Sequence, residues 1–255
     1  MDRFLLTPFL LDREDAGLLA LARDAWRINR PVPAGSTLAE RMSALEEPVA
    51  RHFRGCLESG DRPISVAGDC LSVLGVVAGY QRAGLSPRLL WLDAHGDFNT
   101  PETSPSGFVG GMPLAMLVGR GDQELMRLLR ARPLDEARVT HFDARDLDPL
   151  EREAFEASAI RRAPTLEELA RVAHDGAPLH LHLDCDLIDP RDAPAMLYPA
   201  PGGPRARELA EVLARLARHT RITSLSLSAW SPHLDPSGET AGVVMDVFAA
   251  ATRSG

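Results

Sequence analysis

The feature that most constrains this chain is the segment Asp93–Asp97, in which metal-ligand side chains alternate directly after an apolar run. Leu89–Leu92 predicts a buried strand, and Asp93, His95 and Asp97 follow at every second position. If strand geometry continues, these side chains point the same way and converge at the carboxyl end of a strand, where open α/β sheets place their sites. A polar strand-to-loop corner without a ligand is the alternative interpretation, and the segment alone favours neither.

A second polar strand end makes a metal site the better interpretation. Between residues 179 and 186, leucines on one face alternate with His180, His182, Asp184 and Asp186 on the other. Two carboxylates on one face repel each other unless a proton or a cation intervenes. Carboxylate and imidazole ligands together favour Mn, Zn or Fe over Ca. Two such strand ends predict a dinuclear site.

Composition excludes several classes of partner. A net charge of −8 argues against nucleic acid. No apolar run approaches the roughly 18 residues of a transmembrane helix, so no membrane partner is expected, and Met1–Leu6 lacks the apolar length of a signal peptide. The 3 cysteines are too few for a disulfide framework, so we expect a reducing, cytoplasmic location.

Strand and helix patterns alternate along the chain and predict one three-layer α/β/α domain over residues 1–255, with a mainly parallel sheet covered on both faces. The expected strands are Phe4–Thr7, Ile64–Ala67, Arg88–Asp93, Arg138–Asp143, Pro178–Asp184 and Ile222–Ser228. The expected helices are Leu11–Ile28, Ala39–Leu57 with a break at Pro48, Leu71–Arg82, Met112–Val118, Gln123–Ala131, Pro149–Ala157, one opened by the capping box Thr165–Glu168, Arg205–His219 and Thr240–Arg253. Asn99–Gly111 is expected to be a polar, site-lining loop.

The two polar segments resemble the signature motifs of the ureohydrolases, the arginase and agmatinase family. The matching residues are Asp93-Ala94-His95-x-Asp97-x-Asn99 and Asp184-x-Asp186-x-x-Asp189-Pro190, in the family's order. The resemblance runs from about Gly68 to the C-terminus. It implies the arginase-like fold, two divalent metal ions with Mn²⁺ expected, and a small-molecule amino acid as substrate.

The resemblance also implies a ligand set. Metal A would be held by Cys70, Asp93, Asp97 and Asp184, and metal B by Asp93, His95, Asp184 and Asp186. Cys70 stands where the family strand ending Gly-Gly-Asp-His has its histidine. Because thiolate is soft and Mn²⁺ is hard, Cys70 either binds weakly, shifts the metal preference, or lies beside the metal as a small buried group.

Four further residues match the arginase contacts to an amino acid. Asn99 and Ser106 resemble the loop that holds the substrate carboxylate, and Asp148 and Glu151 resemble the segment that holds the α-amino group. Acidic residues at a helix N-terminus are the alternative interpretation of Asp148 and Glu151. Together the four favour an arginine-like amino acid over a decarboxylated amine such as agmatine.

Two departures from arginase concern the guanidinium end. Gly110 stands where arginases have a proton-handling histidine, and Ala229 where they have a glutamate that pairs with the guanidinium. Glu239 has no predictable place in the pocket. We therefore expect a metal-bridging hydroxide to hydrolyse N-hydroxy-L-arginine, in preference to L-arginine, to ornithine and hydroxyurea or urea, with Asp97 passing a proton to the leaving amine. The N-hydroxy-L-arginine hydrolases of D-cycloserine biosynthesis resemble this chain in having cysteine for the metal A histidine.

Two other functions stay open at this point. A catalytically impaired relative could act as a binding or regulatory subunit, since Cys70, Gly110 and Ala229 all depart from the family pattern. An agmatinase-type hydrolase of guanidino amines is the third possibility. Family arginases form trimers or hexamers, whereas this chain ends at Gly255 directly after its last predicted helix, so a monomer and a homo-oligomer are both expected possibilities.

Overall fold

The computed structural model describes residues 1–172 and 176–252. Its centre is an eight-stranded sheet in the order β4-β1-β5-β10-β9-β6-β7-β8, in which every pair of neighbouring strands is parallel. The strands are β1 (Asp2–Thr7), β4 (Arg27–Ile28), β5 (Arg62–Ala67), β6 (Arg88–His95), β7 (Val139–Asp146), β8 (Arg161–Ala163), β9 (Leu179–Asp184) and β10 (Ile222–Ser228). β2 (Phe9–Leu10) and β3 (Arg13–Glu14) form a separate antiparallel pair.

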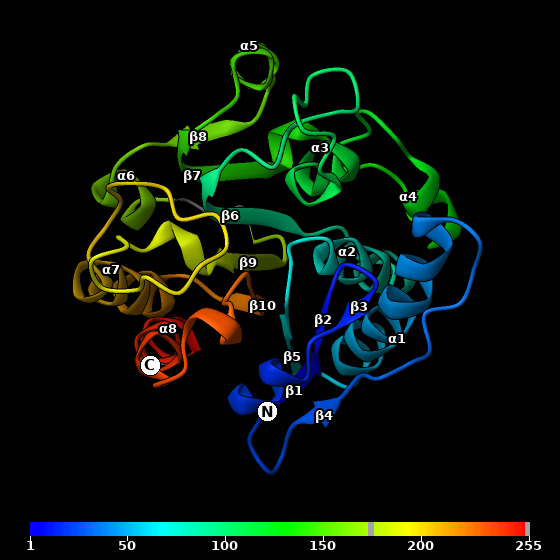
Figure 1. Cartoon of the computed structure of the whole chain (residues 1–255), viewed down its shortest axis with the longest axis horizontal. Coiled ribbons are helices and arrows are strands. Elements are labelled where there is room, and N and C mark those ends of the chain that lie inside the picture. Colours follow the sequence, from blue (N-terminus) through cyan, green and yellow to red (C-terminus); the bar gives the residue numbers. More distant parts are fainter. Residues whose placement is uncertain (173–175, 253–255) are drawn as a thin grey trace.

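Helices cover both faces of the sheet, which confirms the predicted three-layer architecture (Figure 1). One face carries α1 (Leu38–Glu58), α2 (Ser72–Arg82), α3 (Pro113–Leu117) and α4 (Glu124–Leu128), with α5 (Pro149–Glu156) near the β8 edge. The other face carries α6 (Leu166–Ala170), α7 (Ala206–His219) and α8 (Glu239–Thr252). Short 3-10 helices occupy Ala16–Leu21, Val109–Gly111, Glu136–Arg138, Cys185–Leu187 and Pro232–Leu234. Because both faces are covered, every residue of β9 is buried.

The predicted helix over Leu11–Ile28 is wrong. The segment instead contains β3, a 3-10 helix and β4. Asp15 caps the 3-10 helix by accepting from Gly17 N at 2.9 Å, and Leu18 and Leu21 turn inward. β4 pairs with β1 at the edge of the sheet. Non-local strand pairing and a local cap therefore override the apolar spacing.

The predicted break at Pro48 is also wrong, because α1 continues through it to Glu58. An internal proline removes a hydrogen bond and costs about 3 kcal/mol. Here Leu45, Val49 and Phe53 are fully buried in the cluster that α1 shares with α2, and this packing offsets the cost. The last predicted helix is confirmed to Thr252, and its predicted end at residue 253 lies outside the described residues.

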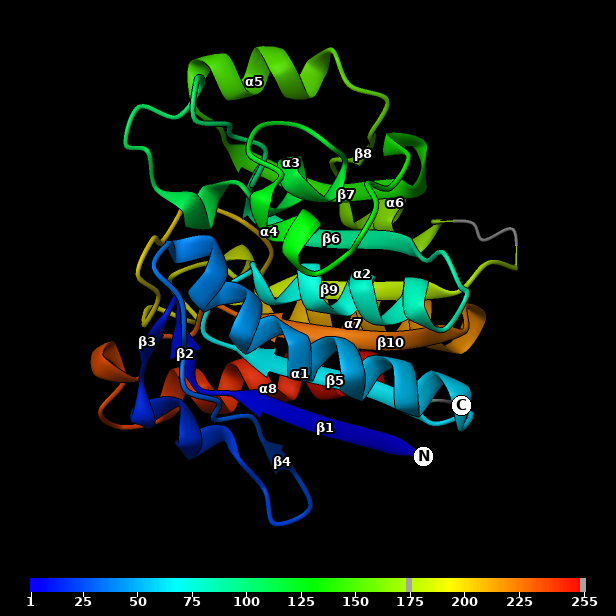
Figure 2. The same ribbon diagram turned by 90° about the vertical axis from the view of Figure 1, so that its right-hand side faces the viewer.

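The fold brings the predicted site residues to one edge of the sheet. β5, β10, β9 and β6 are consecutive in the sheet, and their carboxyl ends share one side of the molecule, together with the long loops (Figure 2). This is where an open parallel sheet leaves room for a ligand. Within the described ranges, no helix combines the length and apolarity that crossing a membrane requires.

Candidate metal centre

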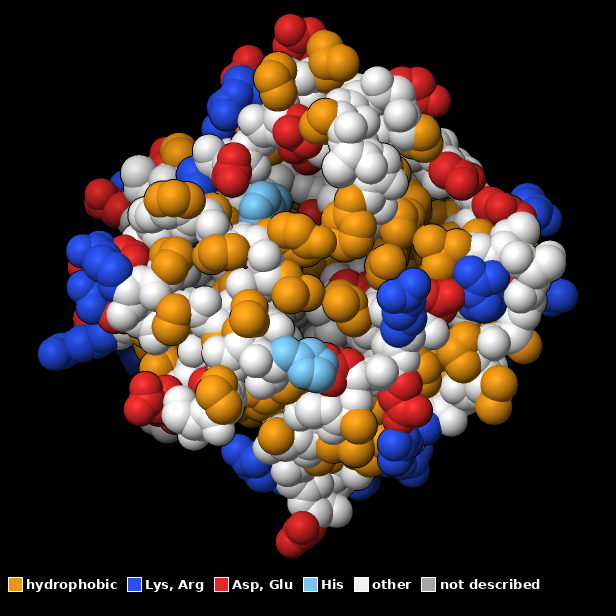
Figure 3. All heavy atoms as spheres, in the orientation of Figure 1, with side chains coloured by type: hydrophobic (Ala, Val, Ile, Leu, Met, Phe, Trp, Pro, Cys, Tyr) orange, Lys and Arg blue, Asp and Glu red, His pale blue; other side chains and the backbone are white. Residues whose placement is uncertain are grey.

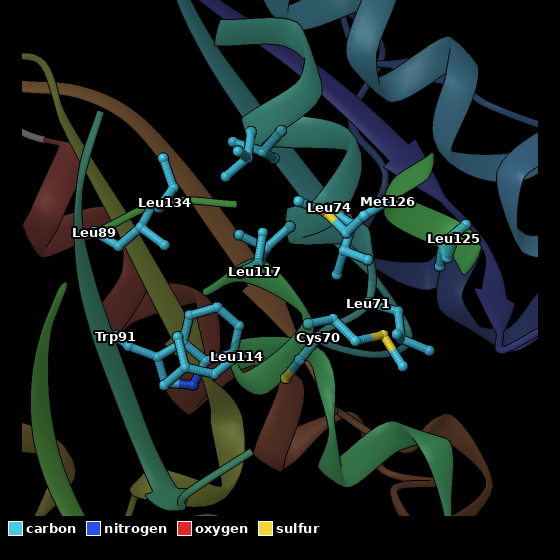
Figure 4. Packing of buried hydrophobic residues seen from close by; sticks show 14 of the residues in the cluster. Cys70, Leu71, Leu74, Leu89, Trp91, Leu114, Leu117, Leu125, Met126 and Leu134 are labelled. Carbon is cyan, nitrogen blue, oxygen red and sulfur yellow. The ribbon is translucent and has the colours of Figure 1, made fainter. Parts of the chain in front are cut away.

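Two groups of metal-ligand side chains form at this edge of the sheet. The first comprises Cys70, Asp93, His182 and Asp184, and the second Asp93, His95 and Asp186; within each group the ligand atoms all lie within 4.8 Å of one another. Asp93 belongs to both groups. Cys70 is also part of the apolar cluster between the sheet and α1–α4 (Figure 4), so the first group lies at the border of the hydrophobic core.

The backbone after β6 places its three ligands by two different means. β6 runs as far as His95, with an irregular register between Asp93 and His95, and Asp93 Oδ1 accepts from His95 N at 2.8 Å. The expected alternation does not extend to Asp97, whose φ of 51° lies in the left-handed region that aspartate tolerates. A turn, not strand geometry, therefore brings Asp97 to the site.

The end of β9 is held in a matching way. Asp184 Oδ1 accepts from Asp186 N at 2.8 Å as the chain enters the 3-10 helix Cys185–Leu187. Asp186 Oδ2 lies 3.0 Å from His95 Nδ1, which joins the two strand ends. Arg145, on β7, holds the segment that follows β9, since its guanidinium donates to the carbonyls of Asp186 and Ala200 at 3.1 Å each.

Electrostatics show that the cluster is short of positive charge. Burial raises the pKa of Asp97 and Asp184 well above the usual range, and neighbouring aspartates raise both pKa values further. The pKa of Asp186 is raised by burial and by the charge of Asp93. Although burial lowers it, the pKa of His95 rises to about 12, because Asp186 and Asp93 favour its charged form. A cation would relieve this repulsion.

The donor atoms fit two divalent ions. Asp97 Oδ2 and Asp186 Oδ1 are buried without a hydrogen-bond partner in the described part of the chain, and such orphan oxygens are typical of a site that takes an ion. The second group offers only oxygen and imidazole nitrogen, whereas the first adds a sulfur. Carboxylate, imidazole and thiolate are all ligands of divalent transition metals.

Five of the six predicted ligands fall within the two groups: Cys70, Asp93, His95, Asp184 and Asp186. Asp97 lines the adjoining cavity but belongs to neither group among the described residues. His182 belongs to the first group and was not predicted as a ligand. The signal for it was present, because the alternation of β9 placed His182 on the face of Asp184, two residues earlier.

Both groups border a cavity of about 360 Å³, which opens on the face shown in Figure 3, where acidic atoms lie in a hollow surrounded by hydrophobic side chains. All four predicted substrate contacts line the same cavity: Asn99, Ser106, Asp148 and Glu151. Gly110, Ala229, Phe108 and Tyr198 also line it. The structure therefore brings together, around one cavity, residues that follow the carboxyl ends of β5, β6, β7, β9 and β10.

The contacts of the predicted substrate residues differ. Asn99 Nδ2 donates to Asp148 Oδ2 at 2.9 Å. Glu151 is buried, and its two oxygens accept from Phe98 N and Asp148 N at 2.9 and 3.1 Å, so the capping box at the start of α5 is present. Ser106 is exposed and accepts from Phe108 N at 3.2 Å. Their contacts with a substrate stay predictions.

The two departures from arginase have structural consequences of their own. A Cβ at Gly110 would lie 2.3 Å from the ring of Phe108, whose centroid is 5.3 Å from that of Tyr198. Phe108 thus occupies the space into which a side chain at position 110 would extend. Ala229 lines the cavity in the left-handed region, with φ 71°. Glu239 is exposed at the start of α8 and, within the described chain, is not among the cavity-lining residues.

The fold has three α/β layers, and at the ends of its central strands two groups of divalent-ion ligands share the carboxylate of Asp93. This combination defines the class of dinuclear-metal hydrolases. The chain belongs to the arginase family, whose family model matches residues 22–252.

Individual relatives agree with this assignment. The arginase of Brucella melitensis is 35% identical over 209 residues, which cover 74% of this chain and 67% of the relative. The arginase of Bacillus caldovelox is 31% identical over 254 residues, covering 92% and 82%. Among solved structures, Bacillus subtilis arginase superimposes with a TM-score of 0.83 at 25% identity, covering 100% of this chain and 99% of that one. Entamoeba histolytica arginase in complex with L-ornithine shares the fold, with a TM-score of 0.81 at 19% identity over 98% of both chains.

Proposed function

We propose that this protein is a dinuclear-metal amidinohydrolase that cleaves the guanidino group of an arginine-like amino acid, with N-hydroxy-L-arginine preferred over L-arginine. The products are ornithine and hydroxyurea or urea. One observation carries the proposal: residues of both metal-ligand groups and Asn99, Ser106 and Asp148 line a single cavity. The arginase relatives support the reaction class.

Two divalent ions, with Mn²⁺ as the first choice, supply Lewis acidity that lowers the pKa of water when they are bound. Cys70, Asp93, His95, Asp97, Asp184 and Asp186 are assigned to holding them. Asp97 also moves the proton to the leaving amine. Its Oδ2 is buried and has no hydrogen-bond partner among the described residues, so it is available to a group in the cavity.

The amino-acid end of the substrate is assigned to the loop side of the cavity. Asn99 and Asp148 are oriented by their mutual hydrogen bond, and the exposed hydroxyl of Ser106 is available to a carboxylate. Both oxygens of Glu151 are taken by backbone N–H groups, so Glu151 contributes by holding Asp148 in place. Binding the unreacting end in this way orients the guanidino carbon.

The preference at the guanidino end rests on charge. The guanidinium of arginine stays protonated in proteins, and placing it beside two metal ions is unfavourable unless an anion compensates. Ala229 offers no charge at the position where arginases have glutamate. A hydroxyguanidine is less basic and needs that anion less. The proposal thus assigns the chain to the branch of N-hydroxy-L-arginine hydrolases known from D-cycloserine biosynthesis.

The test is an assay of the manganese-reconstituted protein with N-hydroxy-L-arginine, L-arginine and agmatine, together with metal analysis. We expect two metals per chain, ornithine from N-hydroxy-L-arginine at the highest kcat/KM, and no turnover of agmatine. A protein that binds no metal after manganese loading, and is inactive, would be a non-catalytic binding relative. Turnover of agmatine would identify a guanidino-amine hydrolase. That residues 1–255 form one cytoplasmic domain is part of the same proposal, and gel filtration distinguishes a monomer from a homo-oligomer.

A further inference from the structure

A chain of side-chain hydrogen bonds, fully buried beyond the partly exposed Thr223, runs along β9 and β10 toward the first metal-ligand group. It starts at the carbonyl of Leu179, which accepts from Thr223 Oγ1 at 2.7 Å. Thr223 Oγ1 lies 2.8 Å from Tyr80 OH, and Tyr80 OH lies 2.6 Å from Ser224 Oγ. Tyr80 and Ser224 are fully buried, so these hydroxyl groups depend on one another for hydrogen bonds.

Two histidines continue the chain. His180 Nδ1 lies 2.7 Å from Ser224 Oγ, and His180 Nε2 lies 2.9 Å from Ser226 Oγ. His182 Nδ1 lies 2.7 Å from the same Ser226 Oγ. Both imidazoles are fully buried. Serines of the neighbouring strand β10 contact both nitrogens of His180 and one nitrogen of His182.

The carbonyl at the start sets the direction of every bond in the chain. A carbonyl oxygen only accepts, so Thr223 gives it its single hydrogen, and Tyr80 must donate to Thr223. Ser224 then donates to Tyr80 and accepts from His180 Nδ1. A neutral imidazole carries one N–H, so His180 Nε2 accepts from Ser226, which in turn accepts from His182 Nδ1.

The lone pair of His182 is therefore on Nε2. This atom lies 3.3 Å from Cys70 Sγ, but the single thiol hydrogen of Cys70 is directed to Asp184 Oδ2 at 2.9 Å. The hydroxyl of Ser228, 3.1 Å from Cys70 Sγ and 3.4 Å from Asp184 Oδ2, supplies one further hydrogen. When Asp184 is ionised, as a metal ligand must be, neither hydrogen is directed to the fully buried Nε2 of His182. The lone pairs of this imidazole, of the thiol and of the carboxylate then face one another. A cation satisfies all three at once.

We propose that His182 Nε2 is a direct ligand of the first metal ion, beside Cys70, Asp93 and Asp184. The proposal rests on the proposed function, because it concerns the same metal centre. The hydrogen bond from His182 Nδ1 to Ser226 is the usual support of a metal-bound imidazole. A sulfur, a nitrogen and two carboxylates suit Zn²⁺ or Co²⁺ better than Mn²⁺, so the two metal positions of this chain differ in metal preference.

Cobalt binding measured by calorimetry and by absorption spectroscopy tests this assignment. We expect wild type to bind two Co²⁺ per chain with a sulfur-to-cobalt charge-transfer band. His182→Leu should weaken the sulfur-containing site by more than about 100-fold and shift that band. Ser226→Ala should weaken it by about 10–100-fold, the effect of losing a group that only orients a ligand. His52→Leu, which removes a buried imidazole on α1 outside both groups, is the matched control and should change nothing.

X-ray absorption of cobalt-loaded His95→Ala gives an answer that does not depend on the folding of a His182 variant. His95 is partly exposed, and without it any imidazole scattering comes from His182. Sulfur and imidazole together around cobalt support the proposal. Sulfur without imidazole overturns it, as does an unchanged cobalt site in His182→Leu. Wild type that binds no cobalt and no manganese overturns the proposed function as well.

Discussion

Substitution of Ala229 by glutamate tests the explanation of substrate preference. We expect Ala229→Glu to shift the ratio of kcat/KM values from N-hydroxy-L-arginine toward L-arginine. Ala229 lines the cavity that also contains the metal-ligand groups, directly after β10. A glutamate here would place a carboxylate at the end of the cavity assigned to the guanidino group.

The size of the shift follows from the environment of residue 229. Contact between fully buried opposite charges is worth roughly 2–5 kcal/mol. Ala229 is only partly buried in an open cavity, so the lower end, about 2 kcal/mol, applies. At about 1.4 kcal/mol for each tenfold, the ratio should change about 30-fold. Alanine already bears the cost of the left-handed backbone, φ 71°, so glutamate adds no new backbone strain.

The assay compares ornithine release from both substrates at fixed manganese concentration and pH. Ala229→Gln is the matched control, because it adds the same volume without the charge. We expect the glutamine variant to lower both kcat/KM values without changing their ratio by more than a fewfold. If glutamate and glutamine shift the ratio equally, or if wild type already favours L-arginine, charge at position 229 does not explain the preference.

Three further predictions concern the metal centre and the amino-acid end. Asp93→Asn removes a charge shared by both ligand groups, so metal analysis should find fewer than two ions per chain and the ornithine assay no turnover; near-normal turnover would contradict a dinuclear centre. Asp148→Ala should raise KM more than it lowers kcat in steady-state kinetics, because it removes a contact to the unreacting end; loss of metal at unchanged KM would make Asp148 structural. The raised pKa values of Asp97 and Asp184 mean that the folded metal-free protein holds protons that the unfolded chain has released. Its free energy of unfolding should therefore fall as pH rises above about 4, and manganese should cancel the fall in urea titrations repeated at several pH values.

The central strands were predictable because their signals are local. Apolar runs bounded by polar ends located β5, β6, β9 and β10, and parallel packing dictates that their carboxyl ends meet. The strand predicted at Phe4–Thr7 is confirmed as β1, but residues 11–28 were not predictable in this way. There, apolar residues with helical spacing form a 3-10 helix instead of an α-helix. In addition, β4 pairs with β1, which lies more than 20 residues earlier in the chain.

The candidate site divides along the same line. Alternation along a strand correctly grouped His95 with Asp93, but a left-handed turn places Asp97, and no pattern of side chains announces that turn. The sequence placed His182 on the correct face, but it does not show that Ser226, which also contacts His180, fixes the ring of His182. That information lies in the register of β9 against β10, which pairs Ser226 with His182.

In the hydrogen-bond chain that ends at His182, the carbonyl at one end fixes which group donates and which accepts in every bond. No link can reverse alone, because each hydroxyl and each imidazole has one hydrogen to give. The choice made at the carbonyl of Leu179 is therefore transmitted through Tyr80 and Ser224 to the metal centre. Among the described residues, Tyr80 belongs to neither metal-ligand group. We nevertheless expect loss of its hydroxyl to let the remaining hydrogen bonds reverse, which would move the lone pair to the other nitrogen of His182. If His182 is a metal ligand as proposed, metal preference depends partly on residues outside the ligand set, such as Tyr80.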